Sequence, residues 1–413
     1  MVTVEKTPTI ATPPLAIEGG SPVRKAPFPP WPVFEPDEVT AVVRVLQSGK
    51  VNYWTGQEAR RFEEEFAQAV ECRYAVAVAN GTVALEAALE ALGIGPGDEV
   101  VVTCRSFVAS AACVLRVGAT PVFADVDRDS QNITAETIAP VLTPRTRAVI
   151  AVHLAGWPCD MDPIMELASR AGLAVIEDCA QAHGARYKGQ PVGSLGHIAA
   201  FSFCQDKIIT TGGEGGMVTT NDPQLWRKVW ELKDHGKNWD LIRQPGNGTF
   251  RWVHESLGTN WRMTEMQAAI GRVALTKLEN WVGIRRANAA ILRRRLAHLP
   301  ALRIPSPPPT VEHSYYKFYA FLRPEFLKPG WDRDRILAAI QAEGIPCGAG
   351  VCPEIYREKL FQDRALGPAA PLPVAHELGQ TSLMFLIHPT LEERDMIDTA
   401  TAIEKVLTAA TVG

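Results

Sequence analysis

Short apolar segments alternate with helical patterns from Tyr74 to Thr220, and this alternation constrains the fold of the 413-residue chain more than any other feature. The segment Tyr74 to Ala79, for example, precedes the alanine-rich stretch Thr82 to Leu92. Such alternation is the signature of a mostly parallel sheet with helices on both faces, so we predict an α/β fold class. Further strands are expected at Glu99 to Cys104, Pro121 to Ala124, Arg147 to His153, Leu173 to Glu177, Ala199 to Phe203 and Gly216 to Thr220, with helices at Phe107 to Val117 and Met161 to Ala171.

The two ends of the chain are organised differently from this middle part. Residues 1–36 are rich in proline and lack periodicity, so we expect an extended arm of the kind that lies on a partner subunit. Residues 37–270 are predicted to form the large domain, and residues 271–413 a smaller C-terminal α+β domain. The elements expected outside the alternating part are helices at Pro36 to Gly49, Thr264 to Ala297 and Asp332 to Ala342, and a strand at His313 to Leu322.

Composition excludes several classes of function. The hydrophobic share of 46% and the net charge of −4 are ordinary for a globular enzyme, so nothing indicates a nucleic-acid partner. The one dense basic run, Arg285-Arg286 with Arg293 to Arg295, has helical spacing and is interpreted as a solvated helix face.

No segment of the sequence has the pattern of a membrane span or a secretory signal. Phe107 to Val117, the longest weakly polar stretch, is interrupted by Arg116 and falls short of the roughly 20 apolar residues that a span needs. We therefore expect no membrane contact and a cytoplasmic location. The eight cysteines lack metal-like spacing, so we expect reduced, mostly buried thiols and no metal site, with a catalytic thiol as the less common alternative.

A possible phosphate site follows the first strand of the alternating part. Asn80-Gly81-Thr82 places a glycine and a hydroxyl where a helix is expected to begin. Free backbone N–H groups and the helix dipole attract phosphate at such a point. A glycine needed only for a tight turn is an equally good interpretation of this motif in isolation.

An acid follows the buried strand Leu173 to Glu177. Asp178 stands at its carboxyl end, where a carboxylate is costly to bury unless a positive group meets it. A protonated pyridine nitrogen is such a group. The alternative is that Asp178 is an N-cap for the next segment.

A lysine and a glycine-rich turn follow the strand Ala199 to Phe203. Lys207 comes shortly after the hydroxyl of Ser202 and before Gly212-Gly213-Glu214-Gly215-Gly216. This arrangement suits an amine that forms a Schiff base beside a bound anion, although a single loop lysine is usually only solvated.

An aromatic side chain, Phe107, completes the ordered set. It lies just past the strand Glu99 to Cys104, where it would stack on a flat ring, although by itself it is more often a core residue. What favours a common site is the order of the set, since its members follow successive strands and ligands bind beyond the carboxyl ends of strands in open α/β sheets.

From about Ile17 to Leu407 the chain resembles the DegT/DnrJ/StrS sugar aminotransferase family. The resemblance implies a pyridoxal-phosphate-dependent transferase of fold type I. The matching motifs are Asn80-Gly81-Thr82-Val83-Ala84-Leu85, Glu177-Asp178-Cys179-Ala180-Gln181-Ala182-His183-Gly184, Phe201-Ser202-Phe203, Lys207, Gly213-Glu214-Gly215-Gly216 and Gly258-Thr259-Asn260-Trp261-Arg262-Met263.

By position, the resemblance implies roles around the ring of pyridoxal 5'-phosphate. Lys207 would form the Schiff base with the cofactor, and Asp178 would pair with the pyridine nitrogen. Gln181 would lie near the 3-hydroxyl group, and Phe107 would stack on the ring.

The resemblance also implies a phosphate site and a homodimer. Ser202 with the amides of Gly81 and Thr82 would hold the phosphate. Asn260 would reach the phosphate from the second subunit, which makes the dimer obligate and its active sites shared.

The implied reaction moves an amino group from L-glutamate or L-glutamine to a keto group. We favour a nucleotide-linked keto sugar as the acceptor, but Ile17-Glu18-Gly19-Gly20 is reminiscent of relatives that act on cyclitol ketones such as an inosose. A lyase or dehydratase on the same fold, and a non-catalytic relative, are the rival interpretations.

Substrate contacts are less specific in the sequence. Arg262 is a candidate for the donor carboxylate. The side chains that would touch substrate or serve the structure alone are His183, His313, Tyr315 and His388.

Overall fold

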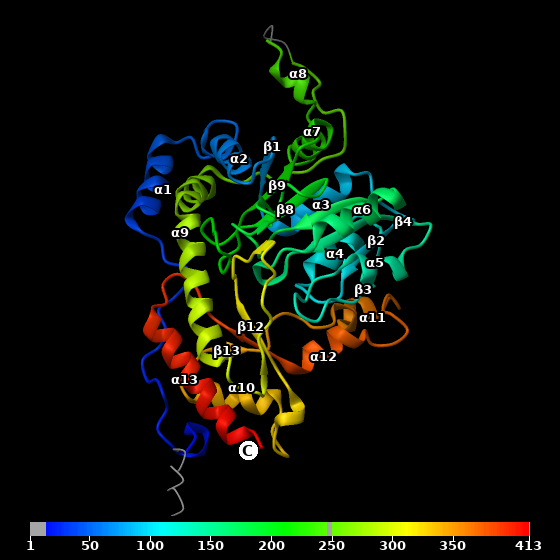
Figure 1. The fold of residues 1–413 in the computed structure, drawn as a ribbon. Helices are drawn as coiled ribbons and strands as arrows, with labels where there is room; N and C mark the ends of the chain where they lie inside the picture. The colour runs from blue at the N-terminus through cyan, green and yellow to red at the C-terminus, as the bar shows by residue number, and fades with distance from the viewer. Residues whose placement is uncertain (1–13, 246–249, 413) are drawn as a thin grey trace, which may run out of the picture.

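A seven-stranded sheet forms the centre of the protein, which a computed structural model describes over residues 14–245 and 250–412 (Figure 1). The strand order is β1-β9-β8-β5-β4-β2-β3, and only β9 runs antiparallel to its neighbours. The predicted mostly parallel α/β sheet is therefore confirmed. The strands are β1 (Tyr74–Val78), β2 (Glu99–Thr103), β3 (Thr120–Ala124), β4 (Thr146–Val152), β5 (Ala174–Asp178), β8 (Ile198–Ser202) and β9 (Gly216–Thr220).

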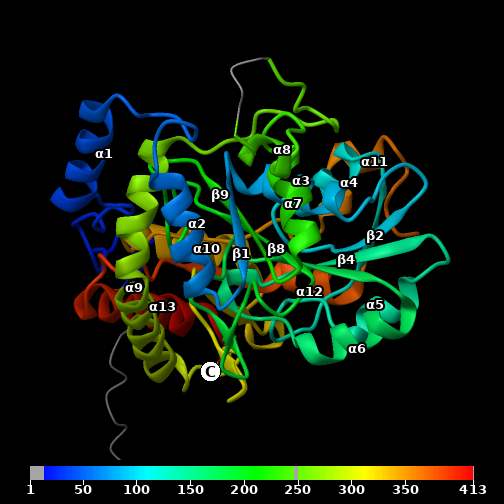
Figure 2. The same cartoon turned by 90° about the horizontal axis from the view of Figure 1, so that it is seen from above.

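Helices cover both faces of this sheet, as Figure 2 shows from above. Because both faces are covered, almost every residue of the central strands is buried, which explains their continuous apolar sequences. One face carries α3 (Gly81–Ala91), α4 (Ala109–Arg116) and α7 (Pro223–Leu232), and the other carries α5 (Ala135–Ile138) and α6 (Met161–Ala171).

A second core lies beside the first and is built on a four-stranded antiparallel sheet of order β10-β12-β14-β13. The long helix α9 (Glu265–Leu296) belongs to both cores, because it packs on α1 and α2 at one end and on α13 at the other. The domain boundary predicted at residue 270 falls inside α9 and stays a prediction. The elements of this part are α1 (Pro36–Ser48), α2 (Glu58–Ala69), β10 (Leu302–Arg303), β12 (Phe318–Leu322), α10 (Arg333–Ala342), β13 (Cys347–Gly348), α12 (Pro373–Thr381), β14 (Ser382–Phe385) and α13 (Glu393–Ala410).

The strand predicted from His313 to Leu322 is wrong in its first half, since β12 begins only at Phe318. The backbone N–H groups of Ser314 and Tyr316 donate to the carbonyls of Gly156 and Ala155, beyond the carboxyl end of β4. These hydrogen bonds draw the segment out of its own sheet and across to the edge of the central one.

The basic run on α9 is also not uniformly solvated as predicted. Arg285 is buried. Its Nη1 donates to the backbone carbonyl of Tyr316 at 3.1 Å, and its guanidinium lies 5.4 Å from the ring centroid of Trp31. Spacing alone did not separate this position from its exposed neighbours Arg294 and Arg295.

The described part of the arm, residues 14–35, lies along the second core of its own chain. Glu343 accepts from the backbone N–H groups of Ala16 and Val23, and Trp31 packs edge-on against Trp281. None of the helices in the described ranges is long and apolar enough to cross a membrane. The remaining short elements are β6 (Arg186–Tyr187), β7 (Gln190–Pro191), α8 (Trp239–Arg243), β11 (Val311–Glu312), α11 (Lys359–Gln362) and five 3-10 turns.

Candidate active site

The predicted site residues converge at the carboxyl edge of the central sheet. β8 and β5 are neighbouring parallel strands, so Ser202 and Asp178, their last residues, lie at the same edge. Gly81, which follows β1, touches Ser202: a β-carbon at position 81 would lie 2.5 Å from the Ser202 Cβ. A side chain at position 81 would therefore push the helix start away from Ser202.

The start of α3 has the chemistry of a phosphate site. The side chain of Asn80 caps the helix by accepting from the N–H of Val83 at 3.0 Å. The amides of Gly81 and Thr82 then stand in the first turn, where no helical acceptor exists and the dipole is positive. Ser202 Oγ accepts from the N–H of Cys204, which leaves its own proton to donate. These groups fit a phosphate.

Asp178 is a buried acid whose burial raises its pKa. Its carboxylate accepts from Ser110 Oγ at 2.7 Å and from the N–H of Ala180 at 3.1 Å. Among the described residues no Lys, Arg or His side chain lies within 4 Å of it. The alternative that Asp178 caps a helix is wrong, because residues 179–197 form turns and two short strands.

The preceding residue, Glu177, shows what a satisfied acid looks like in the same strand. It points to the opposite face, as neighbours in a strand do. Its carboxylate meets His153 Nε2 at 3.0 Å and accepts from the N–H groups of Gly193, Leu195 and Gly196. Asp178 has fewer partners, so its free lone pairs fit a donor such as a protonated pyridine nitrogen.

Lys207 lies in the loop after β8 with its amine largely shielded from water. The amine is 3.9 Å from Asp206 Oδ1 and 4.9 Å from the ring centroid of Tyr316. Tyr316 donates its hydroxyl proton to Asp206. Burial raises the pKa of Asp206, but Lys207 and the Tyr316 hydroxyl outweigh it, so the pKa is lowered and the carboxylate stays ionised.

The three other predicted cofactor contacts differ in exposure. Gln181 is buried, and its Oε1 accepts from the N–H of Ala155 at 2.9 Å. Phe107 is 63% exposed just ahead of α4, so the alternative that it is a core residue is wrong. Asn260 is exposed, and its Oδ1 accepts from the N–H of Arg262 at 3.4 Å.

Two of the candidate substrate contacts are held by the protein itself. Arg262 donates to Asp234 Oδ1 at 2.9 Å, so its guanidinium is already paired. His183 is buried with its ring centroid 5.6 Å from those of Phe201 and Phe203, and burial lowers its pKa to about 3. Both ring nitrogens of His183 are buried without a hydrogen-bond partner among the described residues, and its role stays a prediction.

The other candidates lie on the side of the second core. His313 stacks on Tyr315 with 3.8 Å between ring centroids, and burial lowers the pKa of His313 to about 3. His388 borders a cavity of about 370 Å³ together with Asp206 and Lys317. Of the four, His388 is therefore the one that shares a cavity with the neighbour of Lys207.

Sequence reasoning missed three residues of this site: Ser110, Tyr316 and Trp31. Ser110 holds Asp178 from 68 positions away, Tyr316 orders Asp206, and the indole N–H of Trp31 donates to the carbonyl of Lys207 at 3.1 Å. A serine in a helix and aromatic residues in loops carry no local signal, so only the folded chain reveals them.

Together, a sheet-edge lysine, a buried acid without its own cation and a phosphate turn define the class of pyridoxal-phosphate-dependent enzymes. The profile of the DegT/DnrJ/EryC1/StrS aminotransferase family matches residues 32–404. The chain therefore belongs to this family and is a pyridoxal-phosphate-dependent aminotransferase.

Individual relatives cover nearly the whole chain. It is 38% identical to dTDP-3-amino-3,4,6-trideoxy-alpha-D-glucose transaminase of Streptomyces venezuelae over 365 residues, 88% of this chain and 90% of the relative. It is also 38% identical to L-glutamine:2-deoxy-scyllo-inosose aminotransferase of Streptomyces fradiae over 416 residues, 95% of this chain and 97% of the relative. The solved structure of an aminotransferase from Psychrobacter cryohalolentis is 54% identical with a TM-score of 0.92, covering 93% of this chain and 100% of that one.

Proposed function

We propose that this enzyme transfers an amino group from L-glutamate or L-glutamine to a keto sugar, with a nucleotide-linked sugar as the acceptor, in amino-sugar biosynthesis. The observation that carries the proposal is the placement of Asp178, Lys207 and the Gly81–Ser202 contact at one edge of the sheet. Relatives named for a dTDP-sugar and for an inosose support this chemistry and keep a cyclitol ketone as the second candidate acceptor.

Two groups of residues would contact the cofactor, one at its phosphate and one at its ring. The amides of Gly81 and Thr82 with Ser202 Oγ would hold the phosphate, and Asp178 would keep the ring nitrogen protonated. Gln181 and Phe107 would contact the ring. Bound pyridoxal phosphate supplies an aldehyde that exchanges amino groups and a protonated ring that withdraws electrons from the reacting carbon.

Lys207 would hold the cofactor between turnovers and would move the proton at the α-carbon of the donor during them. Lys207 and the Tyr316 hydroxyl lower the pKa of Asp206, so Asp206 keeps a negative charge beside the Lys207 amine. Trp31 fixes the backbone of Lys207 through its carbonyl. The positive charge of Lys207 also opposes the rise of the Asp178 pKa.

Charge supports a nucleotide-linked acceptor over a neutral cyclitol. Lys317 lines the 370 Å³ cavity beside Asp206 and, within the described ranges, has no acidic group within 4 Å. Lys317 is half-buried, and burial lowers its pKa although the charge of Asp206 opposes the shift. A diphosphate would bring a negatively charged group within reach of the Lys317 amine, whereas an inosose would not.

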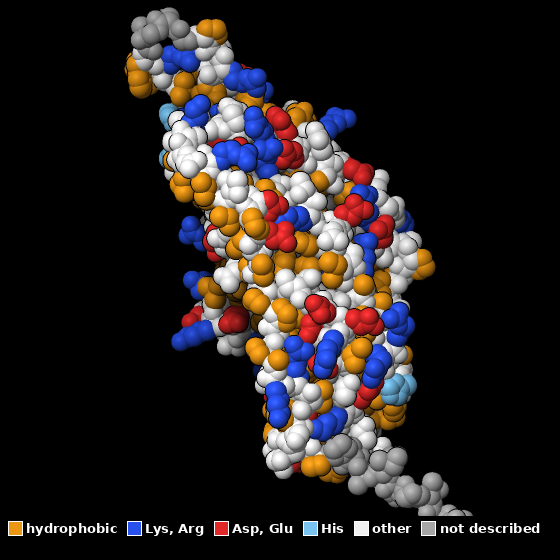
Figure 3. Space-filling view, turned by 90° about the vertical axis from the view of Figure 1, so that its left-hand side faces the viewer, with side chains coloured by type: hydrophobic (Ala, Val, Ile, Leu, Met, Phe, Trp, Pro, Cys, Tyr) orange, Lys and Arg blue, Asp and Glu red, His pale blue; other side chains and the backbone are white. Residues whose placement is uncertain are grey.

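We also propose a homodimer with shared active sites. Figure 3 shows hydrophobic side chains gathered on the face that carries α1, where Val39, Val43 and Leu46 are exposed. Leu257, which is 91% exposed, lies three residues before Asn260. Apolar exposure of this extent is typical of a subunit interface. Pairing two subunits through these surfaces would bring Asn260 of one subunit to the cofactor phosphate of the other. A cytoplasmic location stays a prediction.

The test is the visible absorbance of the cofactor-loaded enzyme before and after L-glutamate or L-glutamine is added. We expect a cofactor band that changes on addition of donor and is lost in Lys207→Ala, while Lys188→Ala, an exposed lysine, keeps it. A band that neither donor moves would contradict transamination and favour a lyase. Amination of dTDP- or UDP-linked keto sugars but not 2-deoxy-scyllo-inosose would decide the acceptor, and the reverse would refute the nucleotide-linked choice.

A further inference from the structure

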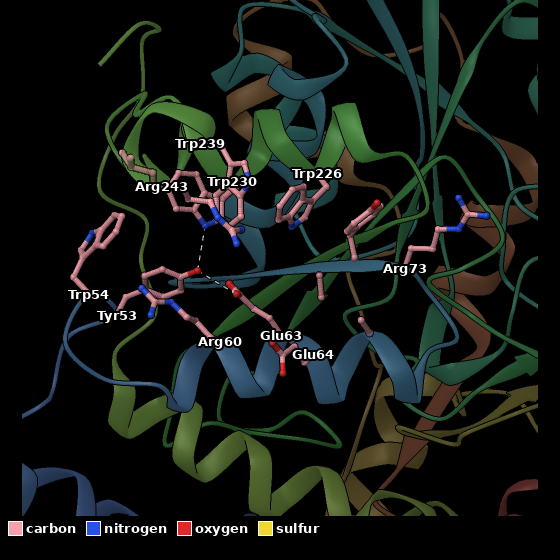
Figure 4. Close-up of a pocket in the computed structure, with 14 residues that line it drawn as sticks. Tyr53, Trp54, Arg60, Glu63, Glu64, Arg73, Trp226, Trp230, Trp239 and Arg243 are labelled. Atoms are coloured by element: carbon pink, nitrogen blue, oxygen red, sulfur yellow. Dashed lines mark hydrogen bonds between the residues drawn. The ribbon is translucent and has the colours of Figure 1, made fainter. Parts of the chain in front are cut away.

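A cavity of about 570 Å³ lies on the outer side of the edge strand β1, between α2 and the pair α7 and α8 (Figure 4). None of the residues that line it belongs to the site around Lys207. Its volume falls in the range of about 300–1,000 Å³ that is typical of small-molecule sites. The family reaction described above makes no use of it.

One wall of this cavity is a continuous band of aromatic rings. Trp239 meets Trp226 and Trp230 edge-on at centroid distances of 4.8 and 4.6 Å, and Trp226 stacks on Tyr74 at 5.1 Å. Figure 4 shows the three tryptophans along α7 and α8, facing α2. Trp226 and Trp239 are half-buried, and the exposed face of an aromatic ring binds a flat ring by stacking.

Arginines surround the aromatic wall. Arg60 lies 5.1 Å from the ring centroid of Tyr53, Arg243 lies 4.8 Å from that of Trp239, and Arg73 lies beside β1. Within the described part of the chain, none of these three guanidinium groups has a carboxylate within 4 Å. Their charge is therefore available to an anionic ligand.

The acid at the floor does not cancel this charge. Glu63 accepts from the Tyr53 hydroxyl at 3.2 Å and from the N–H of Ala77 at 2.9 Å. Burial raises the pKa of Glu63 to about 7 although the buried Lys233 opposes the shift. Near neutral pH, Glu63 is thus partly protonated, and exposed Glu64 is the one other acid in the lining.

We propose that this cavity binds a nucleoside phosphate, separately from the active site. The base stacks on the tryptophan wall, and the phosphate meets Arg60 and Arg243 at the mouth. A free inorganic anion would leave the aromatic wall unused, and an uncharged ring would leave the arginines unpaired. The combination of the two surfaces specifies a ligand that carries both groups.

The test is calorimetric titration of the cofactor-loaded enzyme with ADP and UDP, with adenosine and inorganic phosphate as partial probes. We expect the diphosphates to bind, and either part alone to bind at least tenfold more weakly. Trp239→Ala and Arg243→Ala should each weaken the binding at least fivefold. The matched control is Arg335→Ala, which removes an arginine stacked on Trp331 at 4.2 Å in the second core and should leave the affinity unchanged.

Diphosphate binding that neither variant weakens would place the ligand elsewhere, for example with the acceptor at the active site, and would overturn the proposal. No binding at all would overturn it as well. Arg243→Ala carries the result if Trp239→Ala fails to fold, because Arg243 is exposed. The cofactor spectrum is read separately, so failure of the proposed transamination leaves this test intact.

Discussion

Asp178 at the sheet edge and Glu63 in the aromatic pocket are two acids in closely similar local surroundings. Each carboxylate accepts from one hydroxyl and one backbone N–H, and burial raises the pKa of each. They differ in what opposes that rise. For Glu63 the strongest opposing influence is the buried amine of Lys233, whereas for Asp178 it is the hydrogen bond from Ser110.

This difference between Glu63 and Asp178 helps to distinguish an acid that binds a ligand from an acid that only stabilises the fold. Glu63 shares its surroundings with Lys233, whose buried amine favours the ionised carboxylate and opposes the rise of its pKa. For Asp178 the charges of Lys207 and His153 are weaker influences than the Ser110 and Ala180 hydrogen bonds, so a cationic group of a ligand would add the close positive partner that it lacks among the described residues. A buried charge left without a partner is costly, and the cost is offset where a cofactor supplies the partner.

The largest effect is expected from Asp178→Asn. An amide has the same shape but cannot hold the ring nitrogen protonated, so we expect kcat to fall by about 10²- to 10³-fold. The matched control Asp162→Asn changes an exposed carboxylate and should keep full activity. Steady-state kinetics with L-glutamate measure both. Equal activity of the two variants would show that Asp178 is no more important for catalysis than an exposed surface acid.

A smaller effect is expected from Ser110→Ala, which deletes the hydroxyl that holds Asp178. Losing a hydrogen bond to a charged group costs roughly 1.5 kcal/mol, so kcat should fall about tenfold. The loss also raises the pKa of Asp178 further, so the activity lost should be greatest at the acid end of the pH profile. Ser169→Ala, on the exposed side of α6, is the control. An unchanged pH profile would show that Ser110 does not act through Asp178.

The smallest effect concerns the pH dependence of stability set by Glu63. Its pKa in the folded protein is about 7 against a usual 4.5, so the folded state binds more protons between these values. The free energy of unfolding should therefore fall as pH rises through this window, by less than about 1.4 kcal/mol per pH unit. Glu63→Gln should flatten this slope, and Glu64→Gln should not, as measured by urea unfolding. Identical slopes would mean that Glu63 is not the titrating group.

Much of the fold and the central residues of the site were predictable because their signals are local. Strands buried on both faces give continuous apolar segments, and Asp178 and Lys207 follow such strands directly. The resemblance to known motifs then assigned roles that spacing alone left open. These roles stay predictions for each residue until the variants are measured.

What was missed depends on contacts between distant segments. Tyr316 reaches Asp206 only because hydrogen bonds to the loop after β4 pull its segment out of a regular strand. Arg285 looked like its exposed neighbours because helical spacing does not reveal which side chain finds backbone carbonyls. The aromatic pocket likewise joins residues of α2 to residues of α7 and α8, far apart in sequence.

The shared helix α9 connects the two cores through contacts along its whole length. Its 32 residues span about 48 Å, and Glu265 fastens its beginning to α2 by accepting from the N–H of Glu58 at 2.5 Å. Further along, Lys277 is tied to three acids at the start of α1. Arg285 then donates to the backbone carbonyl of Tyr316, whose ring centroid lies 4.9 Å from the amine of Lys207. A movement of the second core relative to the first would therefore displace α9, and with it the position of Tyr316 beside Lys207.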